Sequence, residues 1–485
     1  MYLGLDLGTS GLRALLIDEA GQPIGAAETH YAAVHPYPGW SEQDPADWTA
    51  AVVQTVAELK ERFPQEIASL IGIGISGHMH GAVLLDDAGS VLRPCILWND
   101  TRSHAEAEEL DSTAGVRNLS GNIVFPGFTA PKLMWVARHE PQVFERVAKV
   151  LLPKDYLNFW LTGLLRGDLS DASGTSWLDV GGQGWSESLL EASGMSRSQM
   201  SELVVGTAAL GKVETRRAAH LGLPKGVVVA GGGADNAAAA CGVGTLKEGQ
   251  GFVSLGTSGV LLAARERYVP MPASAVHTFC HAVPDTWYQM GVILAATDSL
   301  NWLARVFEQD APALTAALGD QITAPGDVRF MPYLSGERTP HNDAKIRGAF
   351  LNLDIGTERN DMVRAVLEGV SFALRDSLEA LKSTGANLSR VTAIGGGAQS
   401  PYWVELLATV LNLPVDLPAK GEFGAALGAA RLAICAVSGA DPKEVMTPPE
   451  VRQTIQPRAD MAADYDAAWK LYRGGYPALR ATMPV

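Results

Sequence analysis

Leu7-Gly8-Thr9-Ser10-Gly11 occurs a second time in the chain, as Leu255-Gly256-Thr257-Ser258-Gly259. Each copy lies between two short apolar runs that are typical of β-strands. Strand, glycine turn and strand therefore follow one another in both halves, which predicts a duplicated α/β domain with a cleft between the copies. The alternative is a chance identity in a chain that contains 51 glycines. The flanking runs are Tyr2 to Asp6, Leu12 to Asp18, Gly251 to Leu255 and Val260 to Ala264.

Other signals extend this pattern. A third extended run from Pro23 completes a β-meander, and Asp44 followed by Pro45 predicts the start of a helix that reaches Leu59. Ile67 to Ile75 predicts the next strand. For the second half we expect a helix over Met362 to Leu381 that ends before Gly385, a strand over Val391 to Ile394, and a helix that starts at Ser400 and Pro401.

Length and composition are typical of an enzyme with two large lobes. The chain has 485 residues, 47% of them hydrophobic, which suits two cores, and we expect lobes at residues 1–245 and 246–485 with a tail that can pack back on the first. The net charge is −15 without a basic run, which excludes a nucleic-acid partner.

Nothing in the sequence predicts export or a membrane span. The first ten residues carry an acid and no basic segment, and the apolar stretch Ala425 to Val437 is interrupted by Arg431. The four cysteines lie far apart without a C-x-x-C pair, which disfavours disulfides and zinc ribbons. We therefore expect a soluble cytoplasmic protein, and a homodimer stays open.

The two glycine turns are candidate phosphate sites. A tight turn of Gly, Thr and Ser presents backbone N–H groups and hydroxyls to phosphate oxygens. Asp6 ends the first strand beside its turn, where a carboxylate can hold Mg²⁺ through the water shell of the ion. Arg13 adds a cation nearby. The alternatives are a turn-capping role for Asp6 and a solvent-facing strand position for Arg13.

Two further glycine groups are candidates for the sugar and adenosine sides. The apolar run Val227 to Gly233 ends in three glycines and is followed by Asp235, which we expect to cap an alanine-rich helix. A helix N-terminus favours an ionised carboxylate, as a general base requires, although a purely structural N-cap is the commoner role. Gly395 to Gly397, followed by Gln399, is a strand-to-helix turn that adenosine can approach closely.

Three other patterns predict no additional site. Gly206 to Lys212 has P-loop spacing but is followed by Val213, which offers no hydroxyl to Mg²⁺, and no glycine group has the dinucleotide spacing. His78 and His80 would face the same way on a strand, yet they lack a third metal ligand, so hydrogen bonding to hydroxyls is favoured. His277, Cys280 and His281 are interpreted as ordinary packing.

Six longer motifs carry more information than the glycine turns. With those turns, they resemble the FGGY family of carbohydrate kinases, in the actin-like, sugar-kinase and heat-shock ATPase superfamily, over nearly the whole chain. The resemblance implies two ribonuclease-H-like domains around a central cleft. The motifs are Gly39 to Pro45 (GWSEQDP), Met79-His80-Gly81, Trp98-Asn99-Asp100, Thr129 to Leu133 (TAPKL), Leu152 to Tyr156 (LPKDY) and Pro332 to His341 (PYLSGERTPH).

The resemblance also implies an activity and a set of roles. It implies that Asp235 takes the proton of the terminal hydroxyl of a ketopentose during transfer of the γ-phosphate of Mg·ATP, with Asp6 as the residue that organises Mg²⁺. D-xylulose is the expected sugar, and L-xylulose, ribulose or another polyol are alternatives. The implied sugar-binding residues are Met79, His80, Trp98, Asp100, Asp235 and Asn236. The implied ATP-binding residues are Thr9, Ser10, Arg13, Gly256, Thr257, Ser258, Gly396, Gly397 and Gln399.

Two residues depart from the family pattern beside the expected sugar site. His78 stands where the family has Gln before Met-His-Gly, and Ala234 stands where it has Gly before the Asp-Asn pair. Both bear on which ketose is preferred. A chaperone-like or cytoskeletal ATPase and an inactive sugar-binding regulator are the rival classes. An ATPase of the first class would have no use for Met79, Trp98 and Asp235 together. An inactive regulator would not need Asp6 and Asp235, and both are present.

Overall fold

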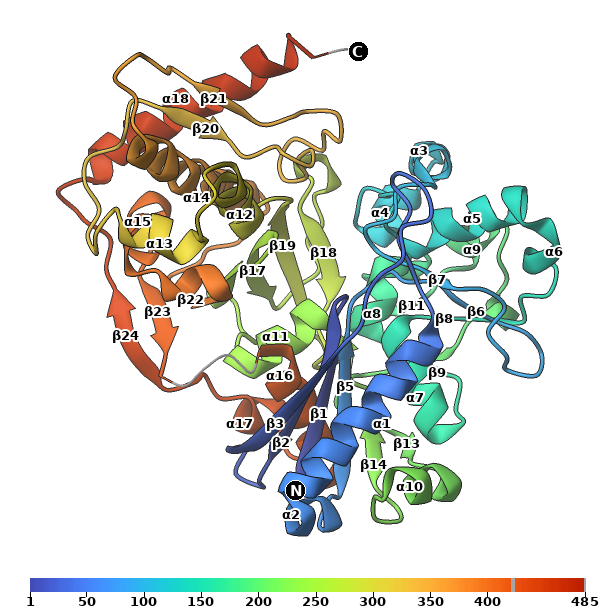
Figure 1. Cartoon of the computed structure of the whole chain (residues 1–485). Helices are drawn as coiled ribbons and strands as arrows, with labels where there is room; N and C mark the ends of the chain where they lie inside the picture. The colour runs from blue at the N-terminus through green and yellow to red at the C-terminus, as the bar shows by residue number, and fades with distance from the viewer. Residues whose placement is uncertain (420–423, 484–485) are drawn as a thin grey trace.

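The structure, a computed structural model, describes residues 1–419 and 424–483 and consists of two lobes on similar sheets (Figure 1). The first sheet has the order β3-β2-β1-β5-β14, and the second has β19-β17-β16-β22-β23. In each, three strands form an antiparallel meander and two more continue parallel to its first strand. The predicted duplication is confirmed. The bounds are β1 Tyr2–Leu7, β2 Gly11–Ile17, β3 Pro23–His30, β5 Gly72–Gly77, β14 Val228–Ala230, β16 Gly251–Leu255, β17 Gly259–Arg265, β19 Trp287–Ile293, β22 Val391–Ile394 and β23 Val415–Pro418.

Shorter strands extend both sheets and form five small ribbons. β13 Ala209–Lys212 and β15 Gly233–Ala234 belong to the first sheet, and β18 His277–Cys280 and β24 Val451–Ile455 are the edges of the second. The ribbons are β4 Glu42–Gln43 with β7 Cys95–Ile96, β6 Val83–Leu85 with β8 Lys149–Leu151, β9 Arg166–Asp168 with β12 Glu202–Val204, β10 Leu178–Asp179 with β11 Gly184–Trp185, and β20 Arg329–Met331 with β21 Ala349–Leu351.

Helices cover both faces of each sheet. In the first lobe they are α1 Pro45–Arg62, α2 Pro64–Ala68, α3 His104–Ser112, α4 Val116–Ser120, α5 Thr129–His139, α6 Pro141–Phe144, α7 Pro153–Thr162, α8 Leu169–Ala172, α9 Glu187–Ala192, α10 Thr215–Leu221 and α11 Asp235–Val243. The later helices are α12 Thr297–Val306, α13 Ala311–Ala316, α14 Arg359–Ser383, α15 Pro401–Leu411, α16 Gly424–Ser438, α17 Pro442–Val445 and α18 Ala462–Arg480.

Helix α1 shows how local sequence signals place an element. The carboxylate of Asp44 accepts a hydrogen bond from the N–H of Ala46 at 2.9 Å, and Pro45 fills the first helical position. Trp48, Val52, Val56 and Leu59 are buried at helical spacing. This helix and those predicted before Gly385 and after Ser400 are confirmed.

Two sequence predictions are wrong in the same region of the fold. The run Ile67 to Ile75 is not one strand, because Pro64 starts α2, which contains Ile67, and β5 begins only at Gly72. β5 ends at Gly77, so His78 and His80 lie beyond the strand rather than on it. His80 has a φ of 72°, which ends any alternation of side chains at that point.

Helices α11 and α16 lie between the two sheets (Figure 1). Their alanines share one core with Tyr2 of the first sheet and Phe252 of the second. Glycine permits this closeness: a Cβ on Gly74 would lie 1.8 Å from the carbonyl oxygen of Ala429 in α16. Part of the second half of the chain therefore completes the first lobe, whereas the last helix, α18, packs on α14 and α15 of the second lobe.

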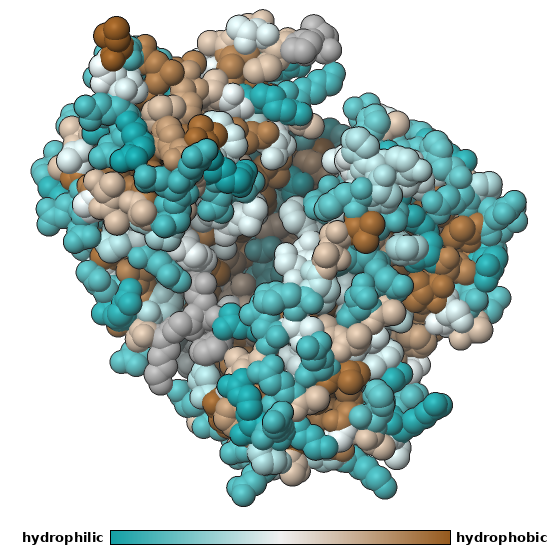
Figure 2. Space-filling view, viewed as in Figure 1, coloured by the Kyte–Doolittle hydropathy of each residue, from teal (hydrophilic) through white to brown (hydrophobic). Residues whose placement is uncertain are grey.

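The lobes also meet through the edge strand β18. The side-chain amide of Asn122 donates to the carbonyl of Thr278 at 2.9 Å and accepts from its N–H at 2.9 Å. Ser173 accepts a hydrogen bond from the N–H of Cys280 at 3.0 Å. Between the lobes the surface is hollowed (Figure 2). None of the helices in 1–419 and 424–483 has the length and apolar composition of a membrane span.

Candidate active site

The first glycine turn is held in place by groups from two neighbouring segments. The indole N–H of Trp98 donates to the hydroxyl of Thr9 at 3.0 Å, and the amide of Gln43 donates to the carbonyl of Thr9 at 2.6 Å. Ser10, at the tip, is exposed. The turn therefore presents a hydroxyl and backbone to solvent from a fixed position.

The second turn is held by the start of α12. The N–H groups of Ala296 and Thr297 donate to the carbonyls of Thr257 at 2.8 Å and Gly256 at 2.9 Å. Thr257 is exposed and Ser258 is half-buried. The two copies thus occupy equivalent places, each joining the first two strands of a meander.

Asp6 is the second-last residue of β1 and lies between two polar neighbours. Its strand partners are Arg13 of β2 and Ser76 of β5, whose hydroxyl donates to the carboxylate at 3.1 Å. Burial raises the pKa of Asp6, while the Ser76 hydrogen bond and the charge of Arg13 oppose this shift. A half-buried carboxylate beside this glycine turn has the donor chemistry that Mg²⁺ prefers.

Asp235 is the first residue of α11 and does not cap it, which corrects the sequence prediction. Ala234 holds the N-cap position, and the Asp235 carboxylate accepts from the N–H and side-chain amide of Asn236 at 2.6 and 2.8 Å. Burial and the charge of Asp6 raise the pKa of Asp235 to about 6, against the pull of these two hydrogen bonds. The carboxylate is therefore ionised at neutral pH and basic enough to accept a proton.

A buried charge cluster that the sequence did not predict lies behind Asp235. The ammonium of Lys154 pairs with Asp155, lies 3.0 Å from Asp168 and 4.0 Å from Asp171, and donates to the carbonyl of Gly231 at 3.3 Å. The three carboxylates converge closely enough to hold a metal ion, but the ammonium already pairs with all of them. Lys154 thus ties α7 to the glycine run before Asp235, and the LPKDY motif was the available signal.

The sugar wall is the group of side chains around Met79 and His80, two residues that we expect to bind the sugar. His80 stacks on Phe128 at 4.5 Å, and its Nδ1 lies 2.7 Å from the carbonyl oxygen of Gly174. Burial lowers the pKa of His80 to about 3, so the ring is neutral. The Met79 sulfur lies 3.9 Å from the hydroxyl of Tyr288. These side chains form a buried, neutral and largely aromatic cluster.

His78 does not belong to this wall. Its ring packs edge-on against Trp48 of α1 at 5.6 Å, and its two nitrogens have no hydrogen-bond partner among the described residues. Burial lowers the pKa of His78 to about 3. The departure from the family pattern at this position therefore alters the core behind the site rather than the surface of the wall.

Asp100 and Trp98 come from one loop but have different surroundings. Both oxygens of the buried Asp100 are occupied, by the guanidinium of Arg102 at 2.9 and 2.6 Å and by the N–H of Ser41 at 2.6 Å. Trp98 is half-buried and touches the first turn. A sugar contact through Asp100 stays a prediction, and its present bonds fix the loop that carries Trp98.

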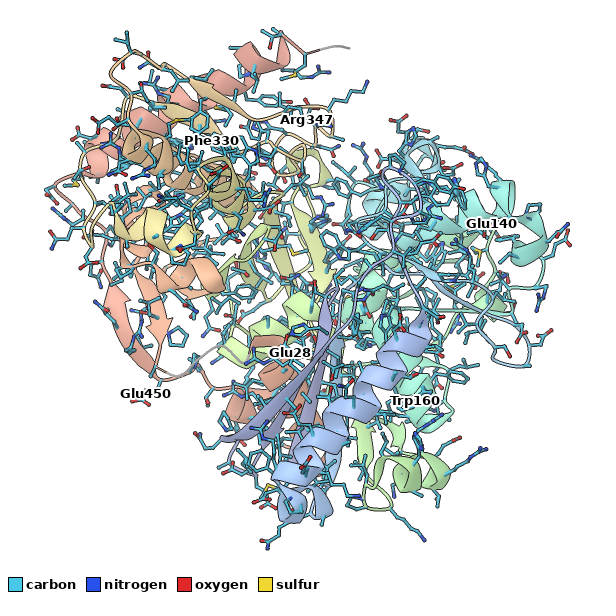
Figure 3. All side chains as sticks on the ribbon, in the orientation of Figure 1. Glu28, Glu140, Trp160, Phe330, Arg347 and Glu450 are labelled. Carbon is cyan, nitrogen blue, oxygen red and sulfur yellow. The ribbon has the colours of Figure 1, made fainter. Side chains whose placement is uncertain are left out.

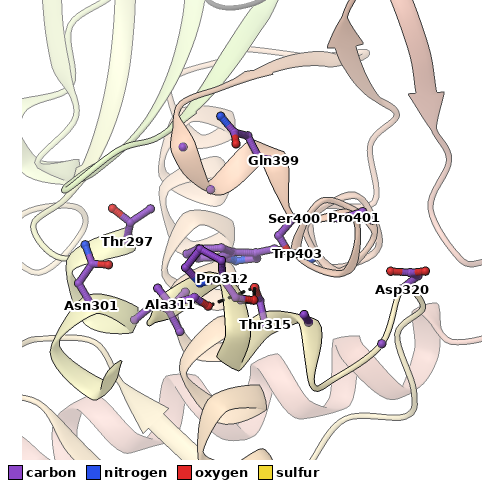
Figure 4. A pocket seen from close by; sticks show the side chains of 15 residues that line it. Thr297, Asn301, Ala311, Pro312, Thr315, Asp320, Gln399, Ser400, Pro401 and Trp403 are labelled. Atoms are coloured by element: carbon purple, nitrogen blue, oxygen red, sulfur yellow. Dashed lines mark hydrogen bonds between the residues drawn. The ribbon is translucent and has the colours of Figure 1, made fainter. Parts of the chain in front are cut away.

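Gly396, Gly397 and Gln399 line a cavity of about 500 Å³ in the second lobe (Figure 4). The indole of Trp403 lies beside Pro312, and its N–H donates to Ser371 at 3.3 Å. A mostly apolar slot with a few polar side chains suits an adenine ring. The sequence did not predict the remaining walls, which are Thr297, Leu300, Asn301, Ala311, Pro312, Thr315, Ala316, Gly319, Asp320, Ser400, Pro401 and Trp403.

The glycine and histidine patterns for which the sequence predicted no site have structural roles. Gly206 to Lys212 ends in β13, an antiparallel strand, rather than in the first turn of a helix. The short β12 does precede it, and α10 begins only at Thr215. His277 stacks on Phe279 at 5.3 Å, and Cys280 and His281 are buried close by. This agrees with the packing interpretation.

Comparisons with known proteins agree with this arrangement. Residues 1–242 match the N-terminal domain of the FGGY family of carbohydrate kinases, and residues 251–437 match its C-terminal domain. The chain belongs to the FGGY family of carbohydrate kinases. It is 43% identical to a xylulose kinase of Escherichia coli and 42% to one of Klebsiella pneumoniae, over the full length of each chain. A crystal structure of a xyloylose kinase from Brucella ovis is 55% identical, with a TM-score of 0.97 over 99% of both chains.

Membership of the FGGY family explains the shared features of the two lobes. The predicted fold, two ribonuclease-H-like domains around a cleft, is confirmed. An FGGY kinase uses ATP and a carbohydrate. The roles of the individual residues stay predictions.

Proposed function

We propose that this FGGY kinase transfers the γ-phosphate of ATP to D-xylulose, giving D-xylulose 5-phosphate and ADP. The observation that carries the proposal is the half-buried carboxylate of Asp235, whose pKa of about 6 suits a general base, in a chain that resembles xylulose kinases from end to end. L-xylulose and ribulose are the nearest alternative substrates, because they differ from D-xylulose only in stereochemistry.

In this mechanism Asp235 accepts the proton of the terminal sugar hydroxyl as its oxygen attacks the γ-phosphorus in line. Asn236 holds the carboxylate through its N–H and side-chain amide. The two glycine turns hold the phosphates from opposite lobes. A general base typically contributes about 10²- to 10⁴-fold and positioning roughly 7–11 kcal/mol, so most of the acceleration comes from alignment in the cleft.

Asp6 is the proposed Mg²⁺ residue. Ser76 donates to one oxygen of its carboxylate, and the negative charge of Asp6 raises the pKa of Asp235, so a cation beside Asp6 would relieve repulsion between them. When bound with ATP, Mg²⁺ neutralises charge on the phosphates. The residues present fit that group, and the carboxylate of Asp6 would hold it through water.

A coupled ADP-release assay over a panel of sugars tests the proposal. We expect ADP release to require a sugar and kcat/KM to be highest for D-xylulose, followed by its stereoisomers, with xylitol and glycerol much lower. A different sugar with a tenfold higher kcat/KM would replace D-xylulose as the substrate. Sugar-independent ADP release at the full rate would instead indicate an ATPase of the actin or heat-shock type.

A further inference from the structure

Arg338 is a cation of the second lobe that reaches the first. It lies in the PYLSGERTPH motif, between β20 and β21, and its half-buried guanidinium lies 4.6 Å from the ring centre of Phe125, a first-lobe residue. Its Nη1 is 3.4 Å from Nε2 of His277. No carboxylate of residues 1–419 or 424–483 lies within ion-pair distance of this guanidinium. The contact with His277 uses one of its five N–H donors.

The neighbouring Glu337 does not neutralise this charge. One oxygen of Glu337 accepts hydrogen bonds from the N–H of Leu294 at 3.1 Å and of Arg338 at 2.8 Å, and the other has no partner among the described residues. Burial raises the pKa of Glu337 to about 8, so it is mainly protonated at neutral pH. Burial also lowers the pKa of Arg338 to about 10, which leaves the guanidinium charged.

Arg338 lies at one end of the wall expected to bind the sugar. His277 is 5.2 Å from Phe125, and both are within 6 Å of Phe128, on which His80 stacks. The charge of Arg338 contributes to lowering the pKa of His80, which places the two side chains within electrostatic reach.

The other end of the wall lies towards the catalytic base. The Met79 sulfur lies 3.9 Å from the hydroxyl of Tyr288, and both residues belong to the same buried cluster as Ala234, which directly precedes Asp235. The wall therefore runs from Asp235, past Met79 and His80, to Arg338. An acyclic sugar along this wall has its terminal hydroxyl at one end and its remaining oxygens at the other.

We propose that Arg338 binds the C2 carbonyl oxygen of the ketose and thereby selects ketoses over polyols. The inference rests on the proposed function, because it places the phosphorylated hydroxyl at Asp235 and the keto end at Arg338. A carbonyl oxygen offers two lone pairs in one plane, which match the planar fork of a guanidinium. The C2 hydroxyl of a polyol is tetrahedral and carries a hydrogen of its own, so it matches that fork less well.

Titration calorimetry with D-xylulose and xylitol tests this assignment, because xylitol replaces only the C2 ketone by an alcohol. We expect Arg338→Met to weaken binding of D-xylulose about 10- to 100-fold and binding of xylitol less than about threefold. Arg338→Lys keeps the charge but loses the fork, so its loss for D-xylulose should be intermediate. Arg347→Met is the matched control, since Arg347 is exposed later in the same loop (Figure 3).

Each outcome decides between sugar recognition and a purely structural contact. Equal losses for both sugars, or no loss for D-xylulose, would overturn the assignment and leave Arg338 as a contact between lobes. ATP affinity, measured in parallel, should stay unchanged in both variants. If Arg338→Met does not fold, Arg338→Lys alone decides the question, and it must lose more affinity for D-xylulose than for xylitol. If the wild-type protein binds no ketose, the proposed function is wrong as well. If the variants keep the wild-type preference for D-xylulose over xylitol, only the role of Arg338 is wrong.

Discussion

At the scale of single residues, Asp6 and Asp235 differ through their surroundings. Burial raises the pKa of Asp6, but a hydroxyl donor and an arginine opposite it favour its charged form. Asp235 has the amide groups of Asn236 but also the negative charge of Asp6, and its pKa rises to about 6. Two carboxylates with such environments are suited to different roles, one towards a cation and one towards a proton.

The pH dependence of activity follows from the raised pKa of Asp235. The base must be ionised, so kcat/KM, which reports the pKa of the free enzyme, should fall as the pH drops through about 6 and be constant above it. Asp235→Asn removes the base without changing its size, and kcat should fall about 10²- to 10⁴-fold with little change in the KM for ATP. A pH–rate profile of both proteins measures this. If the residual activity of Asp235→Asn still falls at low pH in the same way, the fall is due to the titration of another group.

The sequence could find these two aspartates but not their protonation. Asp235 follows a glycine run and Asp6 precedes a glycine turn, and both are local signals. The pKa of each depends on burial and on residues distant in the chain, such as Ser76 for Asp6. Arg338 was missed for a similar reason, since only the fold brings it to Phe125.

At the scale of elements, local signals placed the helices with clear caps and failed where two elements adjoin. Asp44 with Pro45, and Ser400 with Pro401, each start a helix as predicted. Pro64 likewise starts α2, yet the apolar run after it was interpreted as a strand. Apolar residues without strict periodicity suit either state, and tertiary packing decides between them.

Helices α11 and α16 pack closely because glycine lies at their contact. A Cβ on Gly428 would lie 1.7 Å from the carbonyl oxygen of Ala238, so Gly428→Ala must push the helices apart. We expect the free energy of unfolding to fall by about 1–3 kcal/mol or more. Urea denaturation measures this, and Gly474→Ala in α18 is the control.

The control substitution should have the opposite sign. A Cβ on Gly474 meets nothing within 4 Å, and alanine is the better helix former by about 0.5–1 kcal/mol. A similar loss of stability in both variants would show that close packing at Gly428 is not the cause.

At the scale of the whole molecule, the repeated turn predicted the duplication of the domain. The sequence did not predict how the two copies pack against each other. The strand orders match, but α16 belongs to the second half of the sequence and packs on β1 and β5. The lobes meet again where Asn122 bonds both backbone groups of Thr278. The cleft is therefore bordered by contacts from distant parts of the chain.

The contact made by Asn122 should contribute measurably to stability. Asn122→Ala leaves a buried N–H and carbonyl of Thr278 without their partner, which costs about 1–3 kcal/mol. The urea midpoint should fall with little change in the slope of the transition. Asn118→Ala, at an exposed position of α4, should leave the midpoint unchanged. An equal midpoint in both variants would mean that the lobes do not depend on this contact.

The placement of α16 has a consequence for biosynthesis. A ribosome finishes β1, β5 and α11 early, but the helix that covers this sheet emerges only when Ser438 has been made. At about 5–20 residues per second, the roughly 200 residues between take roughly 10 to 40 s. During that interval the nascent first lobe exposes an apolar face, so we expect its maturation to be post-translational or assisted by chaperones that shield such surfaces.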